Sequence, residues 1–156
     1  MGLDMYLSGK RYLWSSGDHP DKKIATDVSA MFPELTPHIE FGTPGPRVNE
    51  ISARAIFWRK ANANQAWFVK NVQGGVDDCG NYYADRDLLT ELRDKCKEVL
   101  ADHSKAAELL PSQSGFFFGG TDFDEYYFGD LERTVKEIDE CLAWPDDWNF
   151  EYHSSW

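Results

Sequence analysis

Residues 115–142 read GFFFGGTDFDEYYFGDLERTVKEIDECL, and this stretch decides the expected fold. Its second half predicts a long amphipathic helix, because large apolar side chains recur at helical spacing, at Tyr127, Leu131, Val135, Ile138 and Leu142. Thr121 or Asp122 is the expected N-cap, since either is followed three residues later by an acid that suits the positive end of the helix. Phe116 to Phe118 are expected to form a buried entry to this helix, followed by a glycine turn.

Strands are predicted on either side of the chain's middle. Leu3, Met5 and Leu7 alternate with polar residues, which is the period of a half-buried strand. Residues 49–58 and 149–156 show the same alternation, and the second of these would turn Phe150 and Tyr152 inward.

Two further helices are predicted, over residues 59–72 and 85–102, the latter with Asp85 as its N-cap. A short, weak helix before Pro33 is indicated as well, and the proline-rich segment 36–47 is expected to be irregular. This order predicts an α+β fold: a small antiparallel sheet packed against about three helices, in a single domain over residues 1–156.

Composition indicates a globular protein of the cytoplasm. The 156 residues suit one domain of ~100–200 residues. No apolar run approaches the ~20 residues of a membrane span, and the N-terminus lacks the apolar stretch of a signal peptide. The chain's three cysteines are odd in number and form no CxxC pair, so we expect reduced, mostly packed thiols.

The charge is unevenly distributed. Residues 1–75 hold nine basic and seven acidic side chains (net +2), whereas residues 76–156 hold seven basic and twenty acidic ones (net −13). A phosphate backbone attracts the opposite sign, so direct nucleic-acid binding is not expected. The acidity suits a solvated face, or a surface made for a basic protein partner.

Known catalytic motifs are missing from the sequence: there is no phosphate loop, no HExxH and no GxSxG. No metal site or cofactor is predicted from residue spacing. Side chains on the glycine-rich turn at 71–80 and the loop at 112–125 could still bind a ligand or Mg²⁺ if the two segments met, and these are Asn71, Asp77, Asp78, Asp122 and Asp124. The ordinary alternative is that the acids are turn and cap residues.

Three motifs resemble a family of small, largely uncharacterised proteins from phages, prophages and bacteria. They are MGLDMYL at the start, WRKANANQAWFVKNVQGGVDDCGNYY at 58–83 and LLPSQSGFFFGGTDFDEYY at 109–127. Together they cover roughly a third of the chain. Similar proteins have a histidine where Gln65 stands, which argues against a catalytic histidine on this helix. Small acidic phage proteins often inhibit host machinery, so the resemblance implies an anti-defence context.

Two functions therefore remain open. The first is a non-enzymatic protein that binds a host protein with a basic surface and inhibits a defence or nucleic-acid-handling factor. Its contacts would be acids and aromatic anchors near the C-terminus: Glu137, Asp139, Glu140, Trp144, Asp146, Asp147 and Trp148. The second is a small enzyme or ligand-binding domain that uses the carboxylates of the two loops, with Mg²⁺ as one option.

Overall fold

The computed structural model describes residues 2–35, 37–40, 42–115 and 118–156. The chain divides into two compact units, one formed by Met1–Gly9 and Arg54–Trp156 and the other by Lys10–Ala53. The expectation of a single domain stays a prediction. The fold class is α+β, with an antiparallel four-stranded sheet among the described residues.

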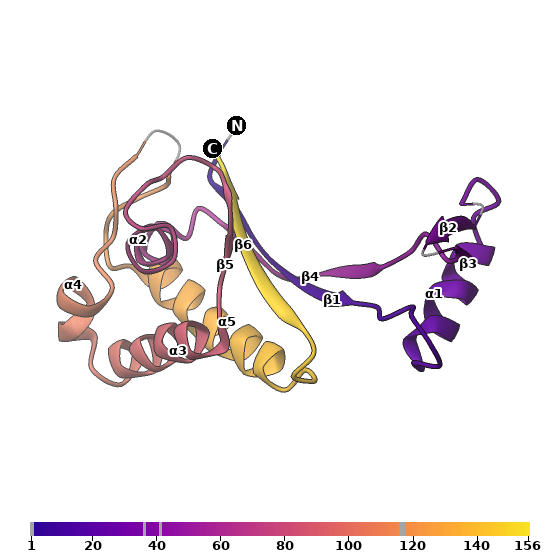
Figure 1. Ribbon diagram of the computed structural model, residues 1–156. Helices are drawn as coiled ribbons and strands as arrows, with labels where there is room; N and C mark the ends of the chain where they lie inside the picture. Colours follow the sequence, from indigo (N-terminus) through magenta and orange to yellow (C-terminus); the bar gives the residue numbers. More distant parts are fainter. Residues whose placement is uncertain (1, 36, 41, 116–117) are drawn as a thin grey trace. The chain divides into compact units, whose positions relative to one another are not determined.

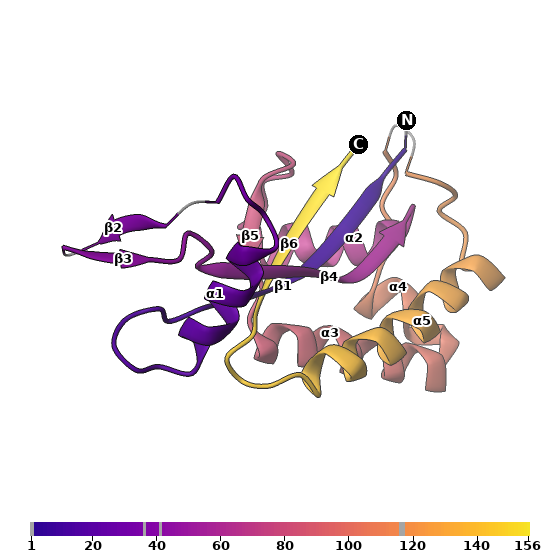
Figure 2. The same ribbon diagram turned by 90° about the vertical axis from the view of Figure 1, so that its right-hand side faces the viewer.

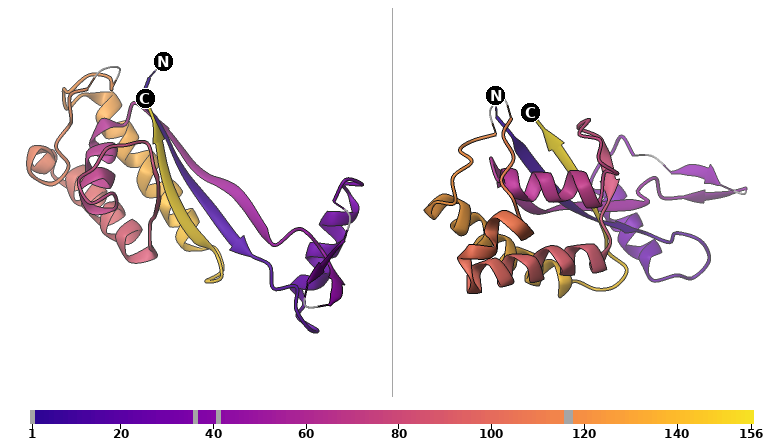
Figure 3. Two further views of the ribbon diagram at one scale, coloured as in Figure 1. Left: turned by 45° about the horizontal axis from the view of Figure 1, so that its top comes forward. Right: turned by 90° about the vertical axis from the view of Figure 1, so that its left-hand side faces the viewer.

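The sheet has the order β4-β1-β6-β5. Its strands are β1 (Asp4–Tyr12), β4 (Glu50–Arg59), β5 (Asn81–Tyr83) and β6 (Asn149–Ser155). β5 and β6 are antiparallel, with Tyr82 opposite Tyr152. The first strand begins, and the last strand ends, at the same end of the sheet (Figures 1 and 3).

Three helices cover one face of this sheet: α2 (Asn62–Asn71), α3 (Arg86–Ala101) and α5 (Glu125–Leu142) (Figures 1 and 3). The alternation in β1 is confirmed, because Leu3, Met5 and Leu7 are fully buried. Phe150 and Tyr152 are buried as expected, and Phe68 of α2 stacks on Tyr152 with ring centroids 3.9 Å apart. The core is thus aromatic at the point where α2 meets the sheet.

Local backbone chemistry moves the starts of two helices from their predicted positions. α2 begins at Asn62 rather than residue 59, because Lys60 adopts a left-handed φ of 59° that interrupts the chain after β4. The N-cap of α5 is Asp124, which accepts hydrogen bonds from the amides of Tyr126 and Tyr127, rather than Thr121 or Asp122. The cap of α3 by Asp85 is confirmed.

The segment after α3 is more ordered than its sequence indicated. A 3₁₀ turn (η1, His103–Lys105) and the short α4 (Ala106–Leu109) occupy residues expected to be a loop. The Asp102 side chain accepts from both the amide and the hydroxyl of Ser104, which starts the turn. Of the predicted buried entry to α5, Phe118 is buried, while Phe116 and Phe117 lie outside the described residues.

Gly9 in β1 marks a close approach inside the larger unit. A Cβ atom there would lie 3.2 Å from Cε3 of Trp148 and closer still to Cζ3 of Trp144. The two indole rings pack edge to face with centroids 5.0 Å apart, and Trp144 also contacts Phe150. The turn that links α5 to β6 is therefore packed against the bare backbone of β1.

The smaller unit contains α1 (Asp21–Ala30) and an antiparallel hairpin of β2 (His38–Glu40) and β3 (Thr43–Gly45) (Figure 2). The expectation that residues 36–47 are irregular is wrong for residues 38–40 and 43–45, which form these two strands. A two-stranded hairpin tolerates Pro44 because each strand keeps an unpaired edge, so the missing amide hydrogen costs no ladder bond. Asp21 is buried and accepts a hydrogen bond from Arg11 at 2.8 Å.

Candidate functional site

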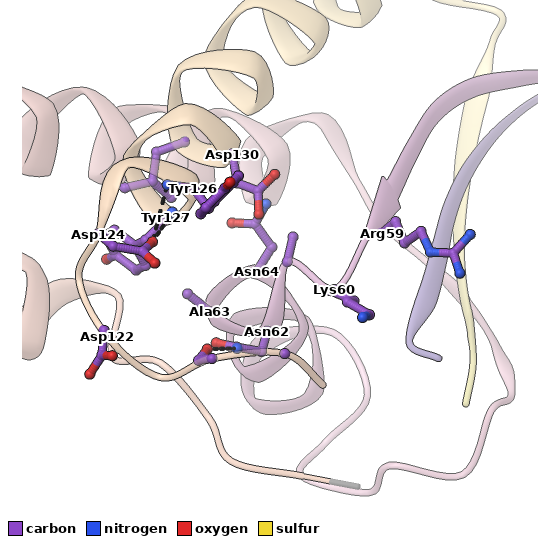
Figure 4. A pocket seen from close by; sticks show the side chains of 14 residues that line it. Arg59, Lys60, Asn62, Ala63, Asn64, Asp122, Asp124, Tyr126, Tyr127 and Asp130 are labelled. Carbon is purple, nitrogen blue, oxygen red and sulfur yellow. Dashed lines mark hydrogen bonds between the residues drawn. The ribbon is translucent and has the colours of Figure 1, made fainter. Parts of the chain in front are cut away.

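A cavity of about 370 Å³ lies between the start of α2 and the start of α5, within the larger unit (Figure 4). Residues 59–64 form one wall, and residues of the loop and helix between Gly119 and Leu131 form the other. Ligand sites commonly have volumes of ~300–1,000 Å³, so a small molecule could fit.

Asn62 holds the two walls together. Its Nδ2 donates to the carbonyl of Gly120 at 2.7 Å and to that of Phe118 at 3.3 Å, while its Oδ1 accepts from the amide of Gln113 at 3.2 Å. The loop is also closed on itself, because the Ser112 hydroxyl donates to the Thr121 carbonyl at 2.6 Å. The glycine-rich loop thereby becomes a fixed edge of the cavity.

Asn64 contributes a buried polar side chain to the cavity lining. The Thr134 hydroxyl donates to the Asp130 carbonyl, so its oxygen must accept from Trp58 Nε1 at 2.9 Å and from Asn64 Nδ2 at 2.8 Å. This arrangement fixes the orientation of the Asn64 amide. Its Oδ1 is buried and has no partner in the part of the chain that the structure describes, although the side chain is only 1% exposed and lines the cavity.

Carboxylates occupy the α5 wall. Burial raises the pKa of Asp130 to about 6, an effect that Arg133 opposes and Asp124 reinforces. Asp124 uses one carboxylate oxygen to cap α5, and Asp122 is exposed at the rim. Burial therefore makes the charged form of Asp130 costly.

Two cationic side chains lie at the rim of the cavity opposite the α5 wall. Lys60 and Arg59 both line the cavity and are exposed. Figure 4 shows Arg59 directed away from the cavity and towards β1, where its Nε lies 3.8 Å from Oδ1 of Asp4. Lys60 thus adds a positive charge near the α2 end of the cavity, where the N-terminus of α2 contributes the positive end of the helix dipole.

Of the predicted ligand residues, Asp122 and Asp124 line this cavity, but the other three do not. Asp77 accepts from Gln65 and Trp156, and Asp78 accepts from the Tyr82 hydroxyl and the Gly80 amide. Asn71 donates to the Trp67 carbonyl and lies beside a different hollow, between α2 and the α3–α4 segment. The joint site of the two loops is not formed at this cavity.

The predicted partner acids are partly paired. Asp139 accepts from Arg93 at 3.1 Å and lies 3.3 Å from Lys97, and Glu137 accepts from Arg133 at 3.1 Å. Glu140, Asp146 and Asp147 are exposed.

The two predicted tryptophan anchors are half-buried rather than free. Trp144 and Trp148 pack on each other and on the β1 backbone at Gly9. The Arg86 guanidinium donates to the carbonyls of Trp144 at 3.1 Å and Pro145 at 2.8 Å, which fixes the turn that carries both rings. Their geometry is that of a structural cluster.

Within the described residues, no group of three or more His, Cys, Asp or Glu side chains is arranged to hold a metal ion. None of the helices in the same residues combines the length and apolar character that crossing a bilayer requires. Comparison with protein-family models, with curated proteins and with solved structures gives no match.

Asn64, Asp130 and Thr134 are among the residues of this site that the sequence did not indicate. Asn64 and Thr134 looked like ordinary polar positions of helices. A usable signal was Thr134 itself, which falls three residues after Leu131 and four before Ile138, on the apolar face of the predicted helix. A polar residue on such a face requires buried partners, and those partners are Trp58 and Asn64.

Proposed function

We propose that this protein binds a small organic molecule in the cavity between α2 and α5. The observation that supports this proposal best is the Oδ1 atom of Asn64, a residue of the cavity lining, which is buried and has no partner among the described residues. A buried acceptor without a partner costs roughly 1–3 kcal/mol, so a ligand that donates to it recovers that free energy. The proposal concerns binding and assigns no chemical step.

A pair of glycine substitutions tests this function. Gly120 lines the cavity, and a Cβ there meets no atom of the described residues within 4 Å, so Gly120→Phe should fold and fill the cavity mouth. Gly129 is equally open but lies outside the cavity lining, which makes Gly129→Phe a matched control.

The measurement is a thermal-shift screen of a chemically diverse small-molecule library. We expect compounds that raise the melting temperature of the wild type and of Gly129→Phe but not that of Gly120→Phe. Hits that stabilise all three proteins equally, or the absence of any hit, would count against a ligand site in this cavity.

We propose binding of a host protein with a basic surface as a second function, in the cytoplasm of a host cell if the chain is phage-encoded. Support comes from the net charge of −11 and from exposed apolar side chains in the Lys10–Ala53 unit. Trp14 is 58% exposed, Met31 72% and Ile39 68%. Inhibition of a defence factor would be one outcome of such binding.

The test of this second function is capture of a host protein followed by its identification and kinetics. Steering by charge predicts that the association rate falls as salt shortens the Debye length from ~10 Å at 0.1 M to ~3 Å at 1 M. Trp14→Ala should weaken capture more than Val76→Ala, since Val76 is similarly exposed but lies outside the smaller unit. An association rate that does not respond to salt would contradict charge steering.

A further inference from the structure

The α2 end of the cavity offers unused backbone donors. Among the described residues no side chain caps α2, and the Asn62 and Gln65 amides donate to the carbonyls of Lys60 and Ala61. For the amides of Ala63 and Asn64, no acceptor is found in the described part of the chain, and both residues line the cavity. These donors, the helix dipole and Lys60 all favour an anionic group at this end.

The α5 end of the same cavity favours a cationic donor. The hydrogen bond from Asn64 Nδ2 to Thr134 of α5 fixes the orientation of the Asn64 amide and leaves Oδ1 as an acceptor. Asp130 belongs to α5 and lines the same cavity. Asp122 and Asp124 add negative charge at the rim. A protonated amine would satisfy Asn64 Oδ1 and compensate the charge of Asp130 together.

We propose that the ligand is a small zwitterion of the amino-acid class, with its carboxylate at the amides of Ala63 and Asn64 and its ammonium at Asn64 Oδ1 and Asp130. This inference rests on the proposed small-molecule function and names the class of ligand. Tyr126 and Tyr127 also line the cavity, so the space beside them can take an apolar or aromatic side chain.

A ligand of single charge fits less well at either end. A simple amine would place its cation near the positive end of α2 and Lys60, with nothing to accept from the free amides. A simple carboxylate would face the three acids Asp122, Asp124 and Asp130 and would leave Asn64 Oδ1 without a donor. A small molecule that carries both charges can interact favourably with both ends of the cavity.

The experiment compares three matched probes by calorimetry on the full chain at pH 7.5: phenylalanine, phenethylamine and 3-phenylpropionate. We expect phenylalanine to bind at least tenfold more tightly than either analogue. Equal binding of phenethylamine would overturn the role of the α2 end, and equal binding of 3-phenylpropionate would overturn the role of Asn64 and Asp130. Binding of none of the three at millimolar concentration would overturn the ligand class.

Two variants localise the interaction. Asn64→Leu removes the free acceptor, and Asp130→Asn removes the charge but keeps the size; each should weaken phenylalanine binding about tenfold or more, while Glu132→Gln, an exposed acid of α5 outside the cavity lining, should not. If Asn64→Leu fails to fold, Asp130→Asn alone decides, and unchanged affinity would overturn the proposal. A library hit that Gly120→Phe abolishes, with no response to phenylalanine, would leave the small-molecule function standing and reject only the zwitterion.

Discussion

Gln65 donates a hydrogen bond of 2.8 Å from Nε2 to Oδ1 of Asp77, which joins α2 to the glycine-rich turn. The Tyr152 hydroxyl donates to Oε1 of the same glutamine, and Trp156 Nε1 donates to Asp77 at 3.0 Å. Gln65 and Tyr152 are fully buried. The network ties α2, the turn and β6 together, so an acid predicted to bind a ligand is occupied in holding the fold.

Substitution of Gln65 should therefore be strongly destabilising. Gln65→Leu keeps the approximate volume but leaves the Tyr152 hydroxyl without its acceptor and removes one of the two side-chain donors to Asp77, and we expect a loss of ~2–4 kcal/mol in the free energy of unfolding. Gln113→Leu is the control, because Gln113 donates to Asn62 through its backbone amide, which the substitution keeps; it should change stability by less than ~0.5 kcal/mol. Urea denaturation measures both, and equal losses would contradict the role of the network.

Asp124 and Asp122 should differ in how much they stabilise the protein, because Asp124 is the N-cap of α5. Asp124→Ala removes the acceptor of the Tyr126 and Tyr127 amides and should cost ~1–2 kcal/mol. Asp122→Ala, at an exposed position before the helix, should cost less than ~0.5 kcal/mol. Thermal melts of the two variants give the comparison, and a larger loss for Asp122→Ala would restore the cap position that the sequence predicted.

Asp130 should make stability depend on pH. Its pKa rises from an ordinary 3.8 to about 6 on folding, mainly through burial, so the folded state holds this proton more tightly than the unfolded state does. The stability contributed by this group is complete below about pH 4, falls as pH rises towards 6, and stays low above it. Asp130→Asn imitates the protonated form and should gain about 1 kcal/mol at pH 7.5, after allowance for the water that reaches the carboxylate, with no gain at pH 4.

Melting curves of wild type, Asp130→Asn and Glu132→Gln across pH 4–8 check this expectation. The Glu132 variant corrects for the general benefit of removing one negative charge from a chain of net charge −11. A gain for Asp130→Asn that is the same at every pH would show that the carboxylate titrates normally in the folded protein.

The cysteines should react in a fixed order. Burial raises the pKa of the Cys96 and Cys141 thiols to about 12 and removes both from solvent, whereas Cys79 is only half-buried on the turn after α2. A thiol reagent at pH 8 should label Cys79 in the native protein and the other two only after unfolding, as peptide mass spectrometry can show. Early labelling of Cys96 would mean that α3 opens without global unfolding.

Periodicity predicted most of the fold, because long apolar repeats leave few arrangements. The stripe of α3, with Leu89, Leu92, Cys96 and Val99, is buried as expected, and β1 alternates as its sequence indicated. The helix starts were less predictable. Asp122 and Asp124 are chemically equal candidates for a cap, and the structure shows that Asp124 accepts from the first amides of α5.

The cavity could be predicted only in part. Asp122 and Asp124 were recognised from local chemistry, but their grouping with Asp77 required two loops to meet, and no local pattern records such a contact. The orientation of the Asn64 amide depends on its hydrogen bond to Thr134, which lies seventy positions away along the chain. A hydrogen bond of that separation leaves no periodic trace in the sequence.

The close contact at Gly9 makes the residue tolerated at position 9 depend on the residue at position 144. Since the indoles of Trp144 and Trp148 occupy the space where a side chain at position 9 would begin, the β1 backbone and this turn form one tightly fitted pair. In a library that randomises position 9 alone, selection for folded protein should return almost only glycine. Randomising position 144 at the same time should admit alanine at position 9 wherever a smaller side chain replaces the tryptophan, so that the two sites would evolve together.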